Sequence, residues 1–252
     1  MVRWLLLAVS VVAVGVALFL PPVPQDPAYH AFSDGAAAFG MPNFLNVASN
    51  LPFLLVGAWG LGTVPARLPA IPRPAYILFC LGVMLVGAGS AYYHYAPTSD
   101  TLVWDRLPMT IAFMALFSIV IGDRLSAPLG RRLLWPLVVA GILSVMYWDW
   151  TELQGRGDLR AYGLVQFLPM VLMPVMLLAE KGRGLRTPWL WATLGTYALA
   201  KVAEQFDAAV HTATGVLSGH TLKHLIGALA VFWALRAMHA ANASGAGDRH
   251  DL

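Results

Sequence analysis

Five residues from two distant parts of the chain have the types and the spacing that a metal-dependent catalytic site needs. His94 follows Ser90 by four residues and precedes Asp105 by eleven, and His220 and His224 stand four apart near the end of the chain. Side chains four residues apart share one face of a helix. Three imidazoles that leave a fourth position open are typical of a catalytic zinc ion. We therefore predict that His94, His220 and His224 bind zinc; the alternative is that they are core histidines bonded to the backbone or to each other.

Asp105 and Ser90 are the residues expected to do chemistry beside that ion. Asp105 could act as general base and acid on water at the zinc, which brings the pKa of that water to about 7. The alternative is a salt bridge with Arg106, or a favourable charge at a helix N-terminus. Ser90 could donate a hydrogen bond to a developing oxyanion. The alternative is that it is a small residue that lets helices pack closely.

Two further polar stripes interrupt apolar stretches of the chain. They are Asn46, Ser49 and Asn50 in one stretch, and Lys201, Glu204 and Asp207 in another. We interpret the first stripe as residues that support the metal ligands or join helices. Lys201 and Glu204 are predicted to form a structural ion pair, whereas Asp207 could orient a ligating imidazole.

The composition indicates a membrane protein. Hydrophobic residues make up 58% of the chain and charged residues 12%, whereas soluble domains contain roughly 45–50% and about 25%. Eight apolar stretches are long enough, or nearly so, to cross about 30 Å of hydrocarbon. They lie at about 4–20, 44–64, 74–95, 102–122, 132–149, 161–179, 188–209 and 218–238. These stretches predict an all-α, polytopic membrane helix bundle, in which polar residues are expensive and mark a functional site.

Cysteine and charge content exclude other classes of protein. Cys80 is the single cysteine, so an intrachain disulfide or a thiolate metal site cannot form. The net charge of +3 is spread over short loops instead of being gathered in one patch. We therefore do not expect nucleic acid as a partner.

The basic residues of the loops indicate how the helices are oriented. Nearly all of them fall at the chain ends or in alternate loops: Arg3, Arg67, Arg73, Arg124, Arg131, Arg132, Lys181, Arg183, Arg186, Arg236 and Arg249. The other loops hold Arg156 and Arg160. Because basic residues mark the cytoplasmic side, we predict that both termini are cytoplasmic. The same topology places His94, Asp105 and His220 together near the outer leaflet.

The chain divides into four segments. Residues 1–21 are predicted to be an uncleaved anchor helix; a signal peptide is the alternative, but no clean cleavage site follows the apolar run. Residues 22–43 form an outer loop, and residues 44–239 form the helical core. Residues 240–252 are small and polar and are predicted to be a disordered tail.

Four short segments together resemble the alkaline ceramidase family, part of a wider group of seven-helix membrane hydrolases that includes the adiponectin receptors. They are NFLNVASN at 43–50, GSAYYH at 89–94, WDRLPM at 104–109 and HTLKH at 220–224. The resemblance extends from about residue 34 to 238. It implies a seven-helix core formed by the second to eighth stretches, with one extra N-terminal transmembrane helix.

The resemblance also implies an activity. His94, His220 and His224 would hold Zn²⁺, Asp105 and Ser90 would assist the water and the oxyanion, and the reaction would cleave the amide of ceramide to a sphingoid base and a fatty acid. Many eukaryotic members carry an acidic calcium-binding segment before the first core helix. Here Asn43 stands where a glutamate is expected, and Asp34 is the remaining carboxylate of that segment. Calcium takes six to eight oxygen ligands, so Ca²⁺ control is doubtful.

Other interpretations of the same residues stay open. The substrate could be another lipid amide or an ester. The protein could be a membrane receptor or scaffold with a structural zinc site, a haem-binding electron carrier with axial histidines, or a transporter. A transporter is the least supported, because the chain has no inverted repeat and no paired broken helices. The sequence does not determine the oligomeric state.

Overall fold

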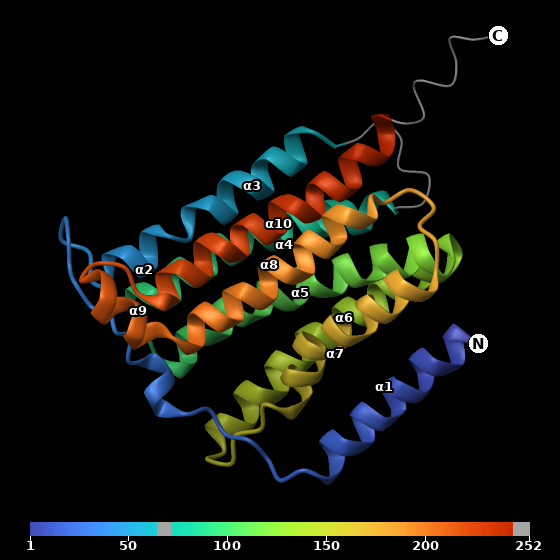
Figure 1. Ribbon diagram of the computed structural model, residues 1–252. Coiled ribbons are helices and arrows are strands. Elements are labelled where there is room, and N and C mark those ends of the chain that lie inside the picture. The colour runs from blue at the N-terminus through green and yellow to red at the C-terminus, as the bar shows by residue number, and fades with distance from the viewer. Residues whose placement is uncertain (65–71, 244–252) are drawn as a thin grey trace.

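A computed structural model describes residues 1–64 and 72–243, with side chains through residue 239, and shows a bundle of long helices (Figure 1). Within those ranges the chain forms no strand, apart from one isolated bridge between Ala38 and Met41. The predicted all-α class is confirmed.

The elements follow one another along the chain without a second domain. They are α1 (Val2–Phe19), η1 (Pro27–His30), α2 (Phe44–Ala48), α3 (Leu51–Gly62), α4 (Arg73–Tyr95), α5 (Ser99–Arg124), α6 (Ala127–Leu153), α7 (Arg160–Ala179), α8 (Thr187–Gln205), α9 (Asp207–Thr214) and α10 (Gly219–Ala243).

Seven segments are long and apolar enough to cross a membrane: α1, α2 with α3, α4, α5, α6, α7 and α10. Seven of the eight predicted stretches correspond to these segments. The exception is α8, which has 19 residues but includes Lys201 and Glu204, and these charged groups lower its mean hydropathy. It nevertheless packs along α10 inside the bundle. The molecule is a polytopic helical membrane bundle, and one of its helices carries an ion pair within it.

Two of the predicted continuous stretches are broken in the structure. The second one divides at Ser49 and Asn50, because Pro52 lies in the first turn of α3 and lacks the N–H that a continuous helix would use. Asn46 O accepts hydrogen bonds from Ser49 Oγ at 3.1 Å and Asn50 Nδ2 at 2.8 Å. The seventh stretch divides at Phe206, which separates α8 from α9. Both breaks lie at the end of the bundle that carries the histidines.

The centre of the bundle is α5, whose most apolar window is 78% buried. Small residues let α4 approach it closely. A Cβ atom at Gly82 would lie 2.9 Å from the backbone nitrogen of Ala112, and one at Gly89 would lie 2.0 Å from the backbone oxygen of Trp104. This contact places the C-terminal part of α4 against the first turns of α5. The helix α5 begins there with a capping box between Thr98 and Thr101.

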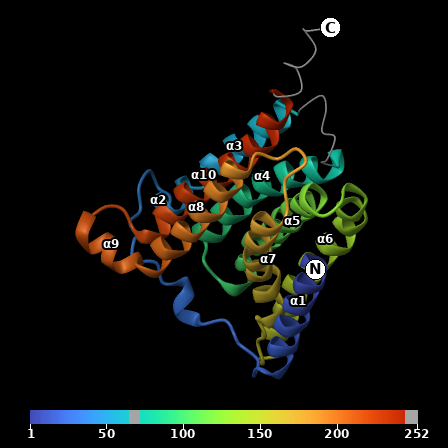
Figure 2. The same ribbon diagram turned by 45° about the vertical axis from the view of Figure 1, so that its right-hand side comes forward.

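The first helix stands apart from the core. Figure 2 shows α1 beside α6 and α7, and Leu6 is its buried residue. Arg160 at the start of α7 holds its C-terminal end by donating to Ala17 O at 3.1 Å. At its other end, Arg3 donates to Leu125 O. An apolar, exposed helix of this kind fits contact with lipid.

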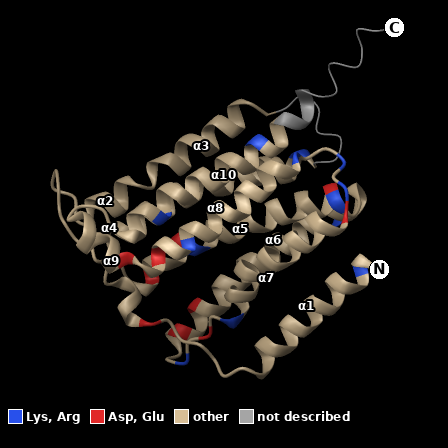
Figure 3. Cartoon of the chain, viewed as in Figure 1, with Lys and Arg blue, Asp and Glu red and all other residues tan. Residues whose placement is uncertain are grey.

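The start of α1 and the end of α10 lie at one end of the bundle, opposite α2 and α9 (Figure 1). The predicted tail overlaps the last helix, because α10 continues to Ala243, past the expected boundary at residue 240. Residues 244–252 of that tail, with Arg249, lie outside the described residues, as does Arg67. Figure 3 shows most charged groups at the two ends of the bundle, with a few on α8 and α10 inside it.

Candidate metal centre

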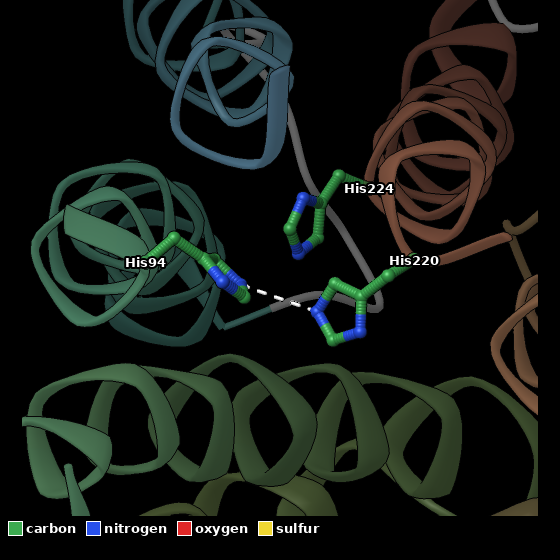
Figure 4. A group of neighbouring side chains, drawn as sticks. All are labelled: His94, His220 and His224. Carbon is green, nitrogen blue, oxygen red and sulfur yellow. Dashed lines mark hydrogen bonds between the residues drawn. The ribbon is translucent and has the colours of Figure 1, made fainter. Parts of the chain in front are cut away.

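The three predicted histidines converge at the end of the bundle where α4 ends and α10 begins (Figure 4). Nε2 of His94 lies 3.2 Å from Nε2 of His220, and one ligand atom of each of the three residues lies within 4.8 Å of the others. All three side chains are buried. Two nitrogens on one tetrahedral zinc ion stand roughly 3.4 Å apart, given Zn–N bonds of about 2.0–2.1 Å. The cluster can therefore hold a metal ion after a small movement of His224.

The hydrogen bonds of His224 leave one nitrogen free for such an ion. Nδ1 of His224 lies 2.8 Å from Ser49 Oγ, and Asn50 Nδ2 is farther away, at 3.5 Å. Because Ser49 donates its own proton to Asn46 O, its oxygen can accept the Nδ1 proton of His224. Nε2 of His224 is buried and has no hydrogen-bond partner among the described residues. The donor set and this orphaned nitrogen fit a zinc ligand held in one tautomer.

The predicted supporting residues take partly different roles. Asn46 Oδ1 accepts from Thr221 Oγ1 at 3.0 Å, and its Nδ2 donates to Asp34 O at 2.7 Å. It thus joins α2 to α10 and to the outer loop. Asn50 bonds mainly to Asn46 and approaches His224 only at long range. Ser49, which the sequence placed in the same stripe, makes the close contact with the imidazole.

Asp207 contacts the backbone of the predicted ligand His220. Its Oδ1 accepts from the backbone N–H of His220 at 2.7 Å, and its Oδ2 accepts from the backbone N–H of Ser33 at 3.0 Å. Burial alone would raise the pKa of Asp207, but the hydrogen bonds from Ser33, His220 and Ser218 lower it below its usual value. The ionised carboxylate therefore fixes the first turn of α10 and the outer loop.

Ser90 and Asp105 lie together beside the histidines. Both are buried, and the Ser90 side chain interacts with the Asp105 carboxyl group. Within the part of the chain that the structure describes, Asp105 makes no ion pair with Arg106. Arg106 turns away, donating to Gln25 Oε1 at 2.6 Å, with its guanidinium 4.2 Å from the ring of Trp148. The salt-bridge alternative for Asp105 therefore does not describe the structure.

A charged network adjoins the histidines and was only partly predicted. Glu204 forms the expected ion pair with Lys201, and its other oxygen accepts from Lys223 Nζ at 2.9 Å. Lys223 Nζ also lies 2.9 Å from Nε2 of His220. The sequence signal for this contact is the spacing of three residues between His220 and Lys223, which places both on one helix face. A metal cation bound by the histidines would repel the charged Lys223 side chain and so favour its ion pair with Glu204.

The outer loop covers the site. The ring of Phe32 lies 4.6 Å from the ring of His94 and 4.8 Å from that of His220. His30 is bonded to Tyr93, with 2.9 Å between Nδ1 and the phenol oxygen. Burial, followed by the charge of Arg106, lowers the pKa of His30. No pattern in the sequence indicates Phe32, because the path of the loop depends on contacts with distant helices.

A cavity of about 320 Å³ extends from this polar end into the bundle. Ser90, Asp105, Lys223 and His224 line its polar end. Its remaining wall is largely apolar and comes from α4, α5, α7, α8 and α10; examples are Phe79, Val83, Leu116, Met173, Leu194 and Ala234. Such a shape fits a lipid chain whose reactive group lies beside the histidines.

Comparison with known proteins decides the family. A model of the ceramidase family matches residues 41–196, which is more than half of the chain. The chain belongs to the ceramidase family. This membership supports a ceramidase-type hydrolase that acts on amide bonds of a lipid. A search of curated proteins finds no match.

The ceramidase match covers only part of the cluster. It includes Ser90, His94 and Asp105 but ends before α10, so the places of His220 and His224 rest on the geometry described above. Asn43 donates its Nδ2 to the backbone oxygen of His94 at 2.9 Å. The prediction against control by Ca²⁺ stays a prediction.

Proposed function

We propose that this protein is a zinc-dependent amidohydrolase that cleaves ceramide-like lipids within the membrane to a sphingoid base and a fatty acid. The observation that carries the proposal is the buried triad of His94, His220 and His224 beside Ser90 and Asp105, at the polar end of an apolar cavity. A triad of this kind leaves one coordination position open, as catalytic zinc requires. The proposal also rests on the family membership.

The residues around the triad can divide the reaction between them. Bound zinc would supply a Lewis acid and would make water a stronger nucleophile at neutral pH. Asp105 accepts a proton from the attacking water and delivers it to the amide nitrogen as the C–N bond breaks. The Ser90 hydroxyl donates a hydrogen bond to the carbonyl oxygen while negative charge develops there. The water oxygen ends on the fatty acid, and the proton ends on the amine.

Burial contributes to this chemistry. Phe32 lies over His94 and His220 and keeps bulk water from their rings. In a site of low dielectric, the interactions of Asp105 and Ser90 with developing charge are stronger than they would be in water. The apolar cavity would hold one hydrocarbon chain of the substrate while its amide lies beside Ser90 and Asp105.

We further infer that the site faces the outer leaflet. The start of α1 and the end of α10 lie at the opposite end of the bundle, and the basic loops fall at that same end. Basic loops mark the cytoplasmic side, which supports cytoplasmic termini. Substrate would enter sideways from the outer leaflet.

A structural zinc site in a receptor or scaffold is the main alternative. It needs a fourth protein ligand, whereas the metal-binding group found among the described residues consists of three histidines. The cavity that reaches His224 also favours an open position. Hydrolysis of another lipid amide or an ester is compatible with the same geometry.

The test is cleavage of a lipid panel by the purified full-length protein in nanodiscs, with products identified by mass spectrometry. We expect release of fatty acid from ceramide, loss of release after treatment with a chelator, and recovery after addition of zinc. Cleavage of an ester or of another amide, and not of ceramide, would show that the protein is a lipid hydrolase with a different substrate from the one proposed. Zinc retention without cleavage of any lipid would support the receptor or scaffold.

A further inference from the structure

Arg106 is a buried cation whose hydrogen-bonding capacity is only partly used. Its side chain is 5% exposed, and Nη2 donates to Gln25 Oε1 at 2.6 Å. The guanidinium also lies against aromatic rings, 4.2 Å from Trp148 and 4.8 Å from Tyr162. Nη1 is buried and has no hydrogen-bond partner among the described residues. A guanidinium has five N–H donors, and leaving buried charged donors unpaired is costly.

Arg106 lines the same cavity as the catalytic candidates. The charged groups of its wall are Asp105, Arg106, Lys201, Glu204 and Lys223. Lys201 and Lys223 both pair with Glu204, and Asp105 interacts with Ser90. The formal charge of these five groups is +1. Arg106 interacts electrostatically with Asp105, but among the described residues it forms no ion pair with a carboxylate.

A structural role accounts for only part of this arrangement. Contacts with aromatic faces stabilise a buried guanidinium, and Gln25 satisfies one of its nitrogens. Neither contact uses Nη1. The planar end of arginine is suited to the oxygens of a carboxylate, and the rest of the cavity is suited to a hydrocarbon chain.

We propose that Nη1 of Arg106 binds the carboxylate of a single-chain lipid in this cavity, so that Arg106 makes the site prefer acidic amphiphiles over neutral ones of equal length. The carboxylate could belong to the fatty acid that the proposed hydrolysis releases, or to an acidic head group such as that of an N-acyl amino acid. The biological meaning of this preference rests on the proposed function, but the binding itself does not.

The experiment measures equilibrium binding to the full-length protein in nanodiscs, by displacement of a fluorescent fatty acid. Palmitate is compared with 1-hexadecanol, and N-palmitoylglycine with N-palmitoylethanolamine. We expect wild-type protein to bind at least one acid roughly tenfold or more tightly than its neutral partner, as a charged hydrogen bond provides. Preference for palmitate alone identifies the released fatty acid as ligand. Preference for N-palmitoylglycine identifies an acidic head group.

Two variants test the residue. Arg106→Met should bring each acid-to-neutral ratio close to one. Gln25→Glu should do the same, because it places a carboxylate next to Nη2 while the guanidinium stays among its aromatic rings, and it decides the question if Arg106→Met does not fold. Arg156→Gln is the matched control, since Arg156 is exposed and lies outside the cavity.

Equal binding of acids and neutral lipids by wild-type protein would overturn the proposal. An acid preference that persists in Gln25→Glu or in a folded Arg106→Met would also overturn it. Failure of the proposed function is a separate result: wild-type protein would release no fatty acid from ceramide but would still prefer the acids.

Discussion

At the residue scale, Ser49 determines which nitrogen of His224 faces the other two imidazoles. It accepts from Nδ1 because its own proton goes to Asn46 O. We predict that Ser49→Ala weakens zinc binding about 10–100-fold, the usual effect of losing a hydrogen-bond partner of a ligating histidine. The measurement is the zinc dissociation constant in competition with a chelator. Ser144→Ala is the control, because Ser144 is also buried but bonds to Gly141 O within α6. An unchanged constant in Ser49→Ala would contradict the role.

Replacement of Asp105 should affect catalysis but not metal binding. We predict that Asp105→Asn retains zinc and lowers the rate of ceramide hydrolysis by about 10²–10⁴-fold, because the amide cannot accept the proton of the attacking water. Zinc content and turnover are measured on the same preparation. Asp149→Asn, a half-buried aspartate elsewhere in the bundle, should keep its activity. Full hydrolysis by Asp105→Asn would remove Asp105 from the mechanism.

Part of the candidate site could be predicted from the sequence, because residue spacing and the direction of the helices bring its histidines together. His94, His220 and His224 meet because their helices end and begin on the same side, and the alternation of basic loops indicated this. The contacts of Ser49 and Phe32 could not be predicted. The first depends on a helix break next to Pro52, and the second on the path of a loop across distant helices. The contact of Asp207 with the backbone N–H of His220 could not be predicted either, because such a partner has no sequence signature.

At the element scale, the contact between α4 and α5 sets the distance from Ser90 to Asp105. Gly89 lies against the backbone of Trp104, where a Cβ atom would be 2.0 Å from a carbonyl oxygen that cannot move independently. We predict that Gly89→Ala forces the two helices apart, destabilises the fold by about 1–3 kcal/mol and lowers activity. Thermal unfolding in detergent and ceramide turnover measure the two effects.

Gly195→Ala is the matched control for that prediction. Gly195 lies inside α8 and an added Cβ would meet no atom within 4 Å. Alanine favours a helix over glycine by about 0.5–1 kcal/mol, so this variant should be as stable as the wild type or more so. If Gly89→Ala behaved like Gly195→Ala, the close approach of α4 and α5 would not position the site.

Hydropathy predicted the positions of the helices well and their interruptions poorly. Apolar runs show which segments lie in lipid, but a break needs a local cause such as Pro52 in α3. The helix α8 shows the opposite limit, because a helix of the bundle can contain charged groups. Lys201 and Glu204 reduce its hydropathy, yet packing against α10 and the pairing of Glu204 with Lys223 hold it in the bundle.

At the scale of the whole molecule, the histidines lie where α4 ends and α10 begins, at the end of the bundle opposite the start of α1. We predict that a cysteine placed at Gln154 is labelled by an impermeant maleimide from outside the cell, whereas one at Lys181 is labelled only after the membrane is opened. Both positions are exposed and follow α6 and α7 respectively. The background is Cys80→Ser, which removes the single native thiol. The reverse labelling pattern would place the site at the cytoplasmic leaflet.

The central claim is that His94, His220 and His224 together bind one zinc ion and leave a position for water. X-ray absorption at the zinc edge of the purified protein tests it most directly. We predict about one zinc per chain, with three imidazole nitrogens at about 2.0–2.1 Å and one further oxygen, and a loss of zinc in His94→Ala. Absence of zinc, a shell of four protein ligands, or an unchanged spectrum in His94→Ala would contradict the claim.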